Sequence, residues 1–160
     1  HCIYSSEEEI KDMKEQGVYI AHSPESNMNV VAGIAPIRKY LQEGLHVGLA
    51  SDVAGGATEN LFTAMMHAIQ VSKLRWRLVD DTLAPLTVPE VFYMATKGGG
   101  EFFEKVGSFE EGYELDAVVL DDSNIPNQEG LSIPERLERF IYLNQEQDIK
   151  AKYVAGRQIF

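Results

Sequence analysis

The feature that most constrains the fold of this chain is a pair of short apolar runs, each ending in polar residues and each followed by a helical pattern. Residues 18–22 and 46–52 are these runs, and they end in His22 and Asp52. Strands that are apolar at nearly every position and alternate with helices are typical of parallel βα units, whose sheet is covered on both faces. The sequence therefore predicts an α/β fold.

Helix signals surround the two runs. Ser6 stands three residues before Glu9, which is the pattern of a capping box, and Gly17 ends the helix that this pattern opens. Pro36 suits the first turn of another helix. The other elements expected in this part of the chain are helices over residues 37–43 and 59–75, a turn at Ser23-Pro24, and a short helix after Gly98-Gly99-Gly100.

The pattern changes at Gly107, where we place a domain boundary between residues 1–106 and residues 107–160. Beyond it, β-prone residues alternate with one helical stretch. The elements expected there are strands over residues 114–120 and 149–160 and a helix over residues 134–143.

Composition excludes several classes of protein. A formal net charge of -11 argues against a nucleic-acid partner, because it repels phosphate backbones. No apolar run approaches the ~20 residues needed to cross a bilayer, so we expect no membrane partner. The single cysteine, Cys2, cannot form an internal disulfide and fits a cytoplasmic protein. Because the chain begins at His1 without Met, we expect it to be a portion of a longer polypeptide.

Three residues stand where strands end, and functional groups of parallel α/β folds collect there. They are His22, Asp52 and His1, the last of which would end a strand outside this chain. A hydrolytic zinc site combines imidazoles with a carboxylate and leaves one position open for water. Taken alone, however, Asp52 also fits a turn former or helix cap, and each histidine fits a hydrogen-bonded structural residue.

Other suggestive residues have simpler interpretations. His46 stands at the entry end of its strand and His67 lies within the long helix, so we expect neither at the site. Gly98-Gly99-Gly100 lacks the Lys-Ser/Thr that follows the glycines of a P-loop. We interpret these glycines as a place where a helix packs closely.

A succession of motifs carries a family resemblance. His1-Cys2-x-Tyr4, residues 21–27 (AHSPESN) and residues 48–56 (GLASDVAGG) resemble the sixth, seventh and eighth strand ends of the barrel in the amidohydrolase superfamily. The stretches AIQVSKLRWRLVDD and ATKGGGEFFEKVGSFEEGYELDAVVLDD are similar to its guanine deaminase branch. The resemblance implies that residues 1–106 form the last βα units of a (β/α)8 TIM-type barrel. Residues 107–160 would form part of a small composite β-sandwich.

The same resemblance implies roles for individual residues. Asp52 would be a zinc ligand and catalytic proton acceptor, and His1 would be a catalytic residue that stabilises developing charge without binding zinc. Both would contact the substrate. His22 and Asn27 would either shape the pocket, with Asn27 as a substrate-binding candidate, or only hold the turn.

Three further positions of these motifs carry expectations. Ser26 would help to orient the loop that follows the strand. Ser23 replaces the cysteine that is usual in the family. The Gly55-Gly56 pair would either supply positive φ for a sharp turn behind Asp52 or form a plain loop.

The function implied is the hydrolytic deamination of guanine to xanthine and ammonia, in purine catabolism. It would use one zinc ion per site, with the remaining zinc ligands and a proton-shuttle glutamate outside this chain, and we expect the complete enzyme to be a homodimer. Two alternatives stay open. The parent could be another amidohydrolase, acting on cytosine, a pterin or a triazine, or the chain could be an inactive fragment that folds only with the missing segment.

Overall fold

A computed structural model describes residues 1–127 and 129–160. Its α-helices are α1 (Glu7–Glu15), α2 (Pro24–Asn29), α3 (Ile37–Gln42), α4 (Leu61–Leu78), α5 (Val88–Ala95), α6 (Lys97–Gly100) and α7 (Ile133–Leu143). Its strands are β1 (Tyr19–His22), β2 (His46–Leu49), β3 (Ala117–Leu120), β4 (Ile149–Val154) and β5 (Arg157–Gln158). Short 3-10 helices span Glu101–Phe103 (η1) and Glu146–Asp148 (η2). In the described part of the chain, no helix combines the length and the apolar character that a membrane span requires.

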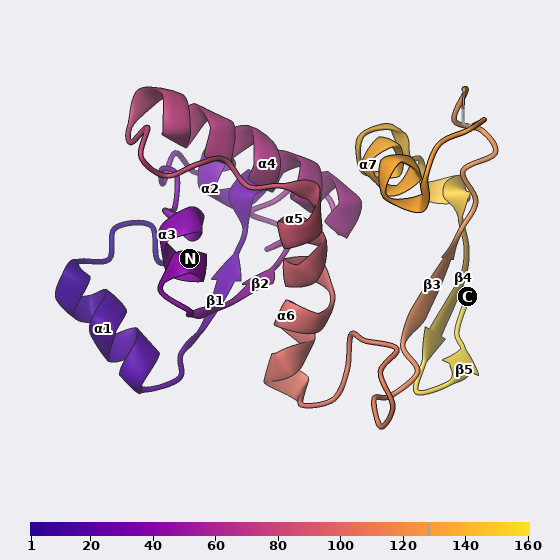
Figure 1. Cartoon of the computed structure of the whole chain (residues 1–160), viewed down its shortest axis with the longest axis horizontal. Coiled ribbons are helices and arrows are strands. Elements are labelled where there is room, and N and C mark those ends of the chain that lie inside the picture. The colour runs from indigo at the N-terminus through magenta and orange to yellow at the C-terminus, as the bar shows by residue number, and fades with distance from the viewer. Residues whose placement is uncertain (128) are drawn as a thin grey trace.

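The first part of the fold is built on the parallel pair β1 and β2 (Figure 1). Their register sets Ala21 beside Gly48 and His22 beside Leu49. Helices α3 to α6 surround the pair, and one hydrophobic cluster joins α3, α4 and α5 to the two strands. The predicted alternation of helices and parallel strands is confirmed. The largest members of this cluster that are almost wholly buried are Tyr40, Ile20, Met94, Ile141 and Val91.

The glycines of α6 pack directly on β2. A Cβ atom built on Gly48 would lie 3.0 Å from the Cα atom of Gly99, too close for any side chain to fit without a backbone shift. Two glycines facing each other therefore allow the helix and the strand to approach more closely than a larger residue would permit. This confirms the interpretation of Gly98-Gly99-Gly100 as a close-packing element.

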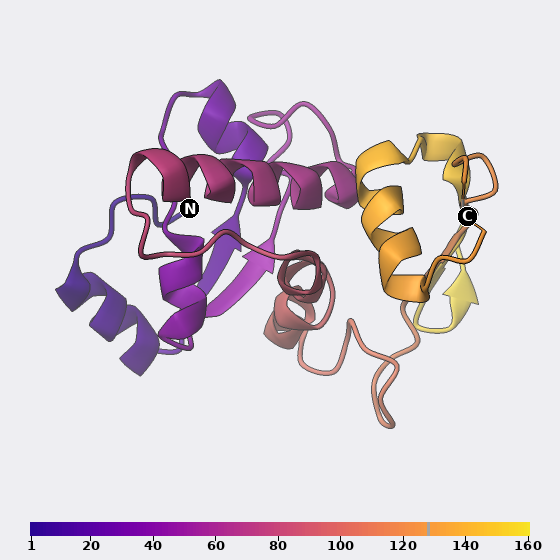
Figure 2. The ribbon, with the colours of Figure 1, turned by 45° about the horizontal axis from the view of Figure 1, so that its top comes forward.

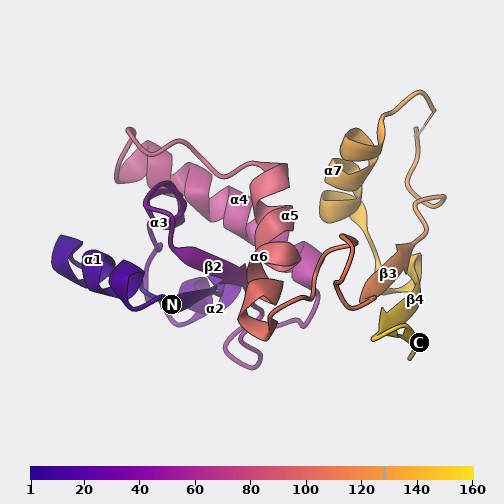
Figure 3. The ribbon, with the colours of Figure 1, turned by 60° about the horizontal axis from the view of Figure 1, so that its bottom comes forward.

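The second part is an antiparallel sheet of order β3-β4-β5 with α7 beside it. Helix α7 packs against the N-terminal end of α4, as Figure 2 shows from above. The rings of Phe62 and Phe140 meet edge to face at 4.9 Å, and Asn60 Nδ2 donates to Asn144 Oδ1 at 3.0 Å. The segment between η1 and β3 links the two parts, as Figure 3 shows. The boundary near residue 107 stays a prediction, because α7 adds Ile141 to the core of the first part.

Two local expectations were wrong, and one helix was missed. The turn expected at Ser23-Pro24 is the start of α2, because proline also suits the first turn of a helix. The single strand expected over residues 149–160 is a hairpin, β4 and β5, that turns at Ala155 and Gly156, both with positive φ. Helix α5 was not anticipated, although a capping box between Thr87 and Glu90 marks its start.

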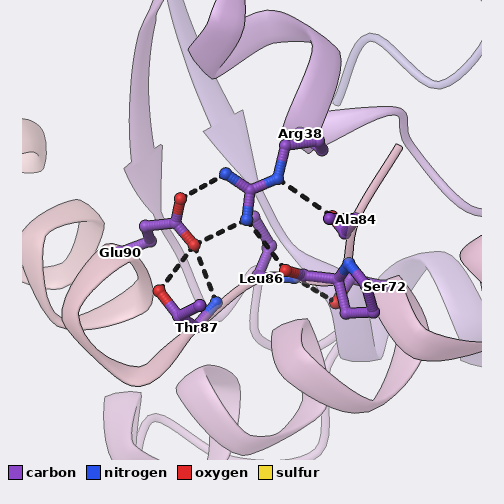
Figure 4. A network of polar contacts seen from close by, with 7 residues as sticks. Arg38, Ser72, Ala84, Leu86, Thr87 and Glu90 are labelled. Carbon is purple, nitrogen blue, oxygen red and sulfur yellow. Dashed lines mark hydrogen bonds and ion pairs between the residues drawn. The ribbon is translucent and has the colours of Figure 1, made fainter. Parts of the chain in front are cut away.

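A network centred on Arg38 fixes α3 against the segment that leads into α5 (Figure 4). Its guanidinium donates to the carbonyl oxygens of Ala84 at 2.9 Å and Pro85 at 2.8 Å and pairs with both carboxylate oxygens of Glu90. Desolvation opposes ionisation of Glu90, yet hydrogen bonds from Arg38 and Thr87 hold the pKa of its carboxyl below the usual value. The network therefore works with Glu90 charged.

Replacing Arg38 with Gln should destabilise the complete protein by about 2–3 kcal/mol, because it leaves a partly buried carboxylate without its cation and two carbonyls without a donor. Denaturant unfolding followed by circular dichroism measures the loss. Arg77→Gln is the matched control, since Arg77 is exposed and contributes no hydrogen bond within the described residues. Equal stability of the two variants would contradict the role given to the network.

Candidate functional site

The structure brings His1, Asn27 and Asp52 together, although they are far apart in the sequence. Nδ1 of His1 lies 2.7 Å from Oδ1 of Asn27, and Nε2 of the same ring lies 3.5 Å from Oδ2 of Asp52. The side chains of His1 and Asp52 are each 43% exposed, so solvent reaches both. The three residues assigned to the site from the sequence therefore share one location, at the C-terminal ends of β1 and β2.

Asp52 lies at this edge because it follows the C-terminal end of β2. The parallel pairing continues one step beyond the strand, where Ala50 N donates to His22 O at 2.9 Å. Asp52 then adopts a φ of 52°, a left-handed conformation that aspartate tolerates better than most residues. Its carbonyl accepts from Gly56 N at 2.8 Å, which closes the turn. The reversal of the chain thus occurs at Asp52 itself.

The two glycines behind Asp52 serve a different purpose from the one expected. Positive φ occurs at neither Gly55 nor Gly56, so of the two alternatives that the sequence left open, the left-handed turn was wrong. A Cβ on Gly55 would instead lie 2.6 Å from Ser26 Oγ and 3.0 Å from Asp52 Oδ2. The absence of a side chain at Gly55 therefore lets α2 and the loop after β2 meet closely.

Helix α2 contributes contacts that the sequence did not reveal. Ser26, expected only to orient a loop, donates from Oγ to Asp52 Oδ2 at 2.5 Å. Asn29 Nδ2 donates to Gly55 O at 2.9 Å and ties the end of the same helix to the loop. The only sequence signal was the position of these residues directly after a strand end.

Contacts with the core anchor the segment that begins at His1. Tyr40, which is fully buried, donates its hydroxyl to the carbonyl of Cys2. Cys2 Sγ also contacts Met13 Sδ of α1 at 3.7 Å. These contacts hold the backbone next to His1 against the core, so that its imidazole extends towards Asn27 and Asp52.

His22 is buried beside the site, with 1% of its surface exposed. Both of its ring nitrogens lack a hydrogen-bond partner among the described residues. Burial lowers the pKa of its imidazole from 6.5 to about 3, so the ring is neutral near pH 7. His22 is therefore a buried, neutral polar side chain at the end of β1.

The other two histidines lie away from the site, as expected. His46 begins β2, stacks on Tyr19 with ring centroids 4.5 Å apart, and has Nδ1 3.1 Å from Glu101 Oε2. His67 lies within α4. His46 is therefore at the opposite end of β2 from Asp52, and His67 is on a different element.

Asp52 fits one position of a metal site. Its Oδ1 atom makes no hydrogen bond within residues 1–127 and 129–160, and a carboxylate oxygen is a suitable donor for zinc. In the same ranges, His, Cys, Asp and Glu side chains form no cluster of three or more that could hold a metal ion. The described chain thus supplies part of a ligand set.

The burial of neutral His22 should make the protein sensitive to acid. Because the pKa falls from 6.5 in the unfolded chain to about 3 in the folded one, the unfolded chain alone binds a proton between these values. Stability attributable to His22 is then complete above pH 6.5 and decreases by about 1.4 kcal/mol per pH unit below it. From pH 7 to pH 5 the loss in unfolding free energy should be about 2 kcal/mol smaller for His22→Gln than for the unaltered protein, measured by denaturant titration. Equal losses of unfolding free energy in the two proteins would contradict the effect assigned to His22.

Comparison with known proteins finds deaminases that resemble the chain over nearly its whole length. The chain is 33% identical over 171 residues to guanine deaminase of Mus musculus, in an alignment covering 99% of this chain and 37% of that protein. It is 50% identical, with a TM-score of 0.95, to the crystal structure of guanine deaminase from C. acetobutylicum with guanine bound in the active site. That match covers all of this chain and 38% of the other.

An adenosine deaminase from Xanthomonas campestris, crystallised with bound zinc, is 25% identical with a TM-score of 0.83 over 99% of this chain and 35% of that one. The chain therefore spans well under half the length of these proteins. The model of the Amidohydrolase family matches residues 1–159. With nearly every residue inside that match, the chain belongs to the amidohydrolase family.

Proposed function

We propose that the complete protein carrying this chain is a guanine deaminase, which hydrolyses guanine to xanthine and ammonia. The observation that supports this most directly is the 50% identity to a guanine deaminase whose active site holds guanine, with a TM-score of 0.95 over the whole chain. The pairing of His1 with Asp52 at the C-terminal ends of parallel strands is consistent with it, because sites of α/β enzymes form there.

We also propose that residues 1–106 are the last βα units of a TIM-type barrel and that residues 107–160 belong to a composite β-sandwich. The parallel pair β1 and β2 supports the first part, since parallel strands occur almost only in larger sheets that helices cover. The antiparallel sheet β3-β4-β5, which is separate from that pair, supports the second.

Zinc is the cofactor that we propose, because a zinc-containing deaminase shares this fold at 25% identity and Asp52 has a carboxylate oxygen free to bind it. When bound, zinc would act as a Lewis acid and would make water nucleophilic near neutral pH. Asp52 would hold it, together with residues outside this chain. The 160 residues alone would then bind zinc weakly.

Asp52 and His1 would have different roles: Asp52 would accept a proton, and His1 would stabilise developing charge. Water adds to the ring carbon that bears the amino group, and ammonia leaves after proton transfer. The carboxylate of Asp52 lies beside His1 at the proposed site, so it can accept the proton that the attacking water loses. His1, 3.5 Å away through Nε2, is placed to stabilise charge that develops on the substrate.

The substrate assignment is tested with the complete protein loaded with stoichiometric zinc. We expect loss of guanine absorbance with release of one ammonia per guanine. Adenosine, cytosine, a pterin and a triazine form the comparison panel, because the same chemistry applies to each ring. Turnover of one of these rings, with guanine unaffected, would replace the proposed substrate.

Asp52→Ala in the complete enzyme should lower kcat by at least about 10³-fold and weaken zinc binding, because it removes a ligand and the proton acceptor together. Zinc content by metal analysis and ammonia release are the two measurements. His67→Gln is the control, and its activity should stay within about twofold of the unaltered enzyme. Similar losses in both variants would show that the site is misplaced.

A further inference from the structure

Two consecutive residues of α2 contact the two catalytic candidates separately. Ser26 Oγ donates to Asp52 Oδ2 at 2.5 Å, and Asn27 Oδ1 lies 2.7 Å from His1 Nδ1. Neighbours on a helix point roughly 100° apart, so one turn can reach two different partners. We propose that Ser26 and Asn27 are positioning residues, of which Ser26 orients the carboxylate of Asp52 and Asn27 orients the imidazole of His1. This inference rests on the proposed function.

Asn27 determines which nitrogen of His1 faces the reaction. A carbonyl oxygen can only accept a hydrogen bond, so the contact with Asn27 Oδ1 places a proton on Nδ1 of His1. In the neutral imidazole Nε2 is then the nitrogen without a proton. This atom is the one that faces Asp52, at 3.5 Å. Asn27 therefore sets the direction of the ring. Because Asp52 Oδ2 only accepts, Nε2 can donate to it, or to negative charge on a substrate, only in the imidazolium form, in which Nδ1–H still points to Asn27 Oδ1.

Ser26 fixes the carboxylate of Asp52 in a comparable way. The single proton of its hydroxyl goes to Oδ2, and hydrogen bonds to an ionised carboxylate are short and strong. With Oδ2 held, rotation of the carboxylate is restricted and Oδ1 keeps one direction. In the described chain Oδ1 has no hydrogen-bond partner, so it is the oxygen left for an external ligand.

Both contacts are made by buried residues of a helix that packs against its neighbours. Ser26 and Asn27 are 3% and 2% exposed, and α2 packs against α4. Asn29 Nδ2 holds Gly55 O at 2.9 Å, and the lack of a side chain at Gly55 lets Ser26 approach the carboxylate. Polar groups that orient ligands from such a buried shell commonly change metal affinity or activity by 10–100-fold when removed.

The first test replaces Ser26 with Ala in the complete zinc enzyme. We expect kcat for guanine to fall about 10–100-fold with KM changed less than about threefold, and zinc affinity of the metal-free protein, from chelator competition, to fall about 10-fold or more. Ser23→Ala is the matched control: Ser23 is equally buried, directly precedes α2, and makes no capping hydrogen bond. It should leave both quantities within about twofold.

A conservative variant separates orientation from packing. Ser26→Thr keeps the hydroxyl and should retain kcat and zinc affinity within about fivefold of the unaltered enzyme. If Ser26→Ala fails to fold, as judged by circular dichroism, the test rests on Ser26→Thr. A loss of kcat or zinc affinity greater than about fivefold in that variant would overturn the positioning role of Ser26. Ser26→Ala that folds and matches Ser23→Ala in kcat and zinc affinity would overturn it as well.

The second test addresses Asn27. Asn27→Ala should lower kcat about 10-fold or more while zinc affinity stays within about twofold, because His1 is not proposed as a ligand. Asn27→Asp keeps an acceptor oxygen facing Nδ1 and should retain more activity than the Ala variant. Equal activity in the two variants, or a loss of zinc affinity as large as that of Ser26→Ala, would contradict the assignment.

The two proposals fail in different ways. An unaltered enzyme that binds zinc without deaminating guanine would refute the proposed substrate, and the zinc affinity of Ser26→Ala would still decide the role of Ser26. The kcat of the Asn27 variants is then measured on whichever ring of the panel is turned over. An enzyme that deaminates guanine with Ser26→Ala unimpaired would refute the positioning role alone.

Discussion

The parallel register of β1 and β2 is the constraint on which the rest of the structure depends. It aligns His22 with Leu49, so that both strands end at the same edge. The helix that follows β1 and the loop that follows β2 must then begin side by side. A shift of the register by one residue would also move the buried side chains of one strand to the opposite face of the sheet, because side chains alternate along a strand. The contact between Ser26 and Asp52 follows from this alignment.

Signals that act over a few residues explain what could be predicted from the sequence. The capping box of Ser6 and Glu9 and the apolar runs that became β1 and β2 act locally, and their elements form where they were expected. Ser23-Pro24 was ambiguous for the same reason, since a proline after serine fits both a turn and a helix start. The hairpin of β4 and β5 depends on positive φ at Ala155, for which alanine gives no warning.

The candidate site was predictable only in part. Asp52, His1 and Asn27 could be identified because they belong to motifs whose order resembles a family. Ser26 could be seen only as part of a loop, because its partner is 26 residues away and their meeting depends on tertiary structure. Gly55 is the clearest example of a role that could not be predicted from the residue type. Its residue type suggested a backbone conformation, whereas the structure uses the space that its missing side chain leaves.

The candidate site combines two partly exposed side chains, His1 and Asp52, with two buried ones behind them, Ser26 and Asn27. The side chains of His1 and Asp52 are each 43% exposed in this chain. Exposed side chains lose more entropy when they are held in one geometry, and solvent weakens their mutual attraction. Ser26 and Asn27 lie almost wholly buried behind them, where hydrogen bonds are stronger and competing water is excluded. The orientation of His1 and Asp52 can therefore be set by buried side chains that pack in the core of this chain.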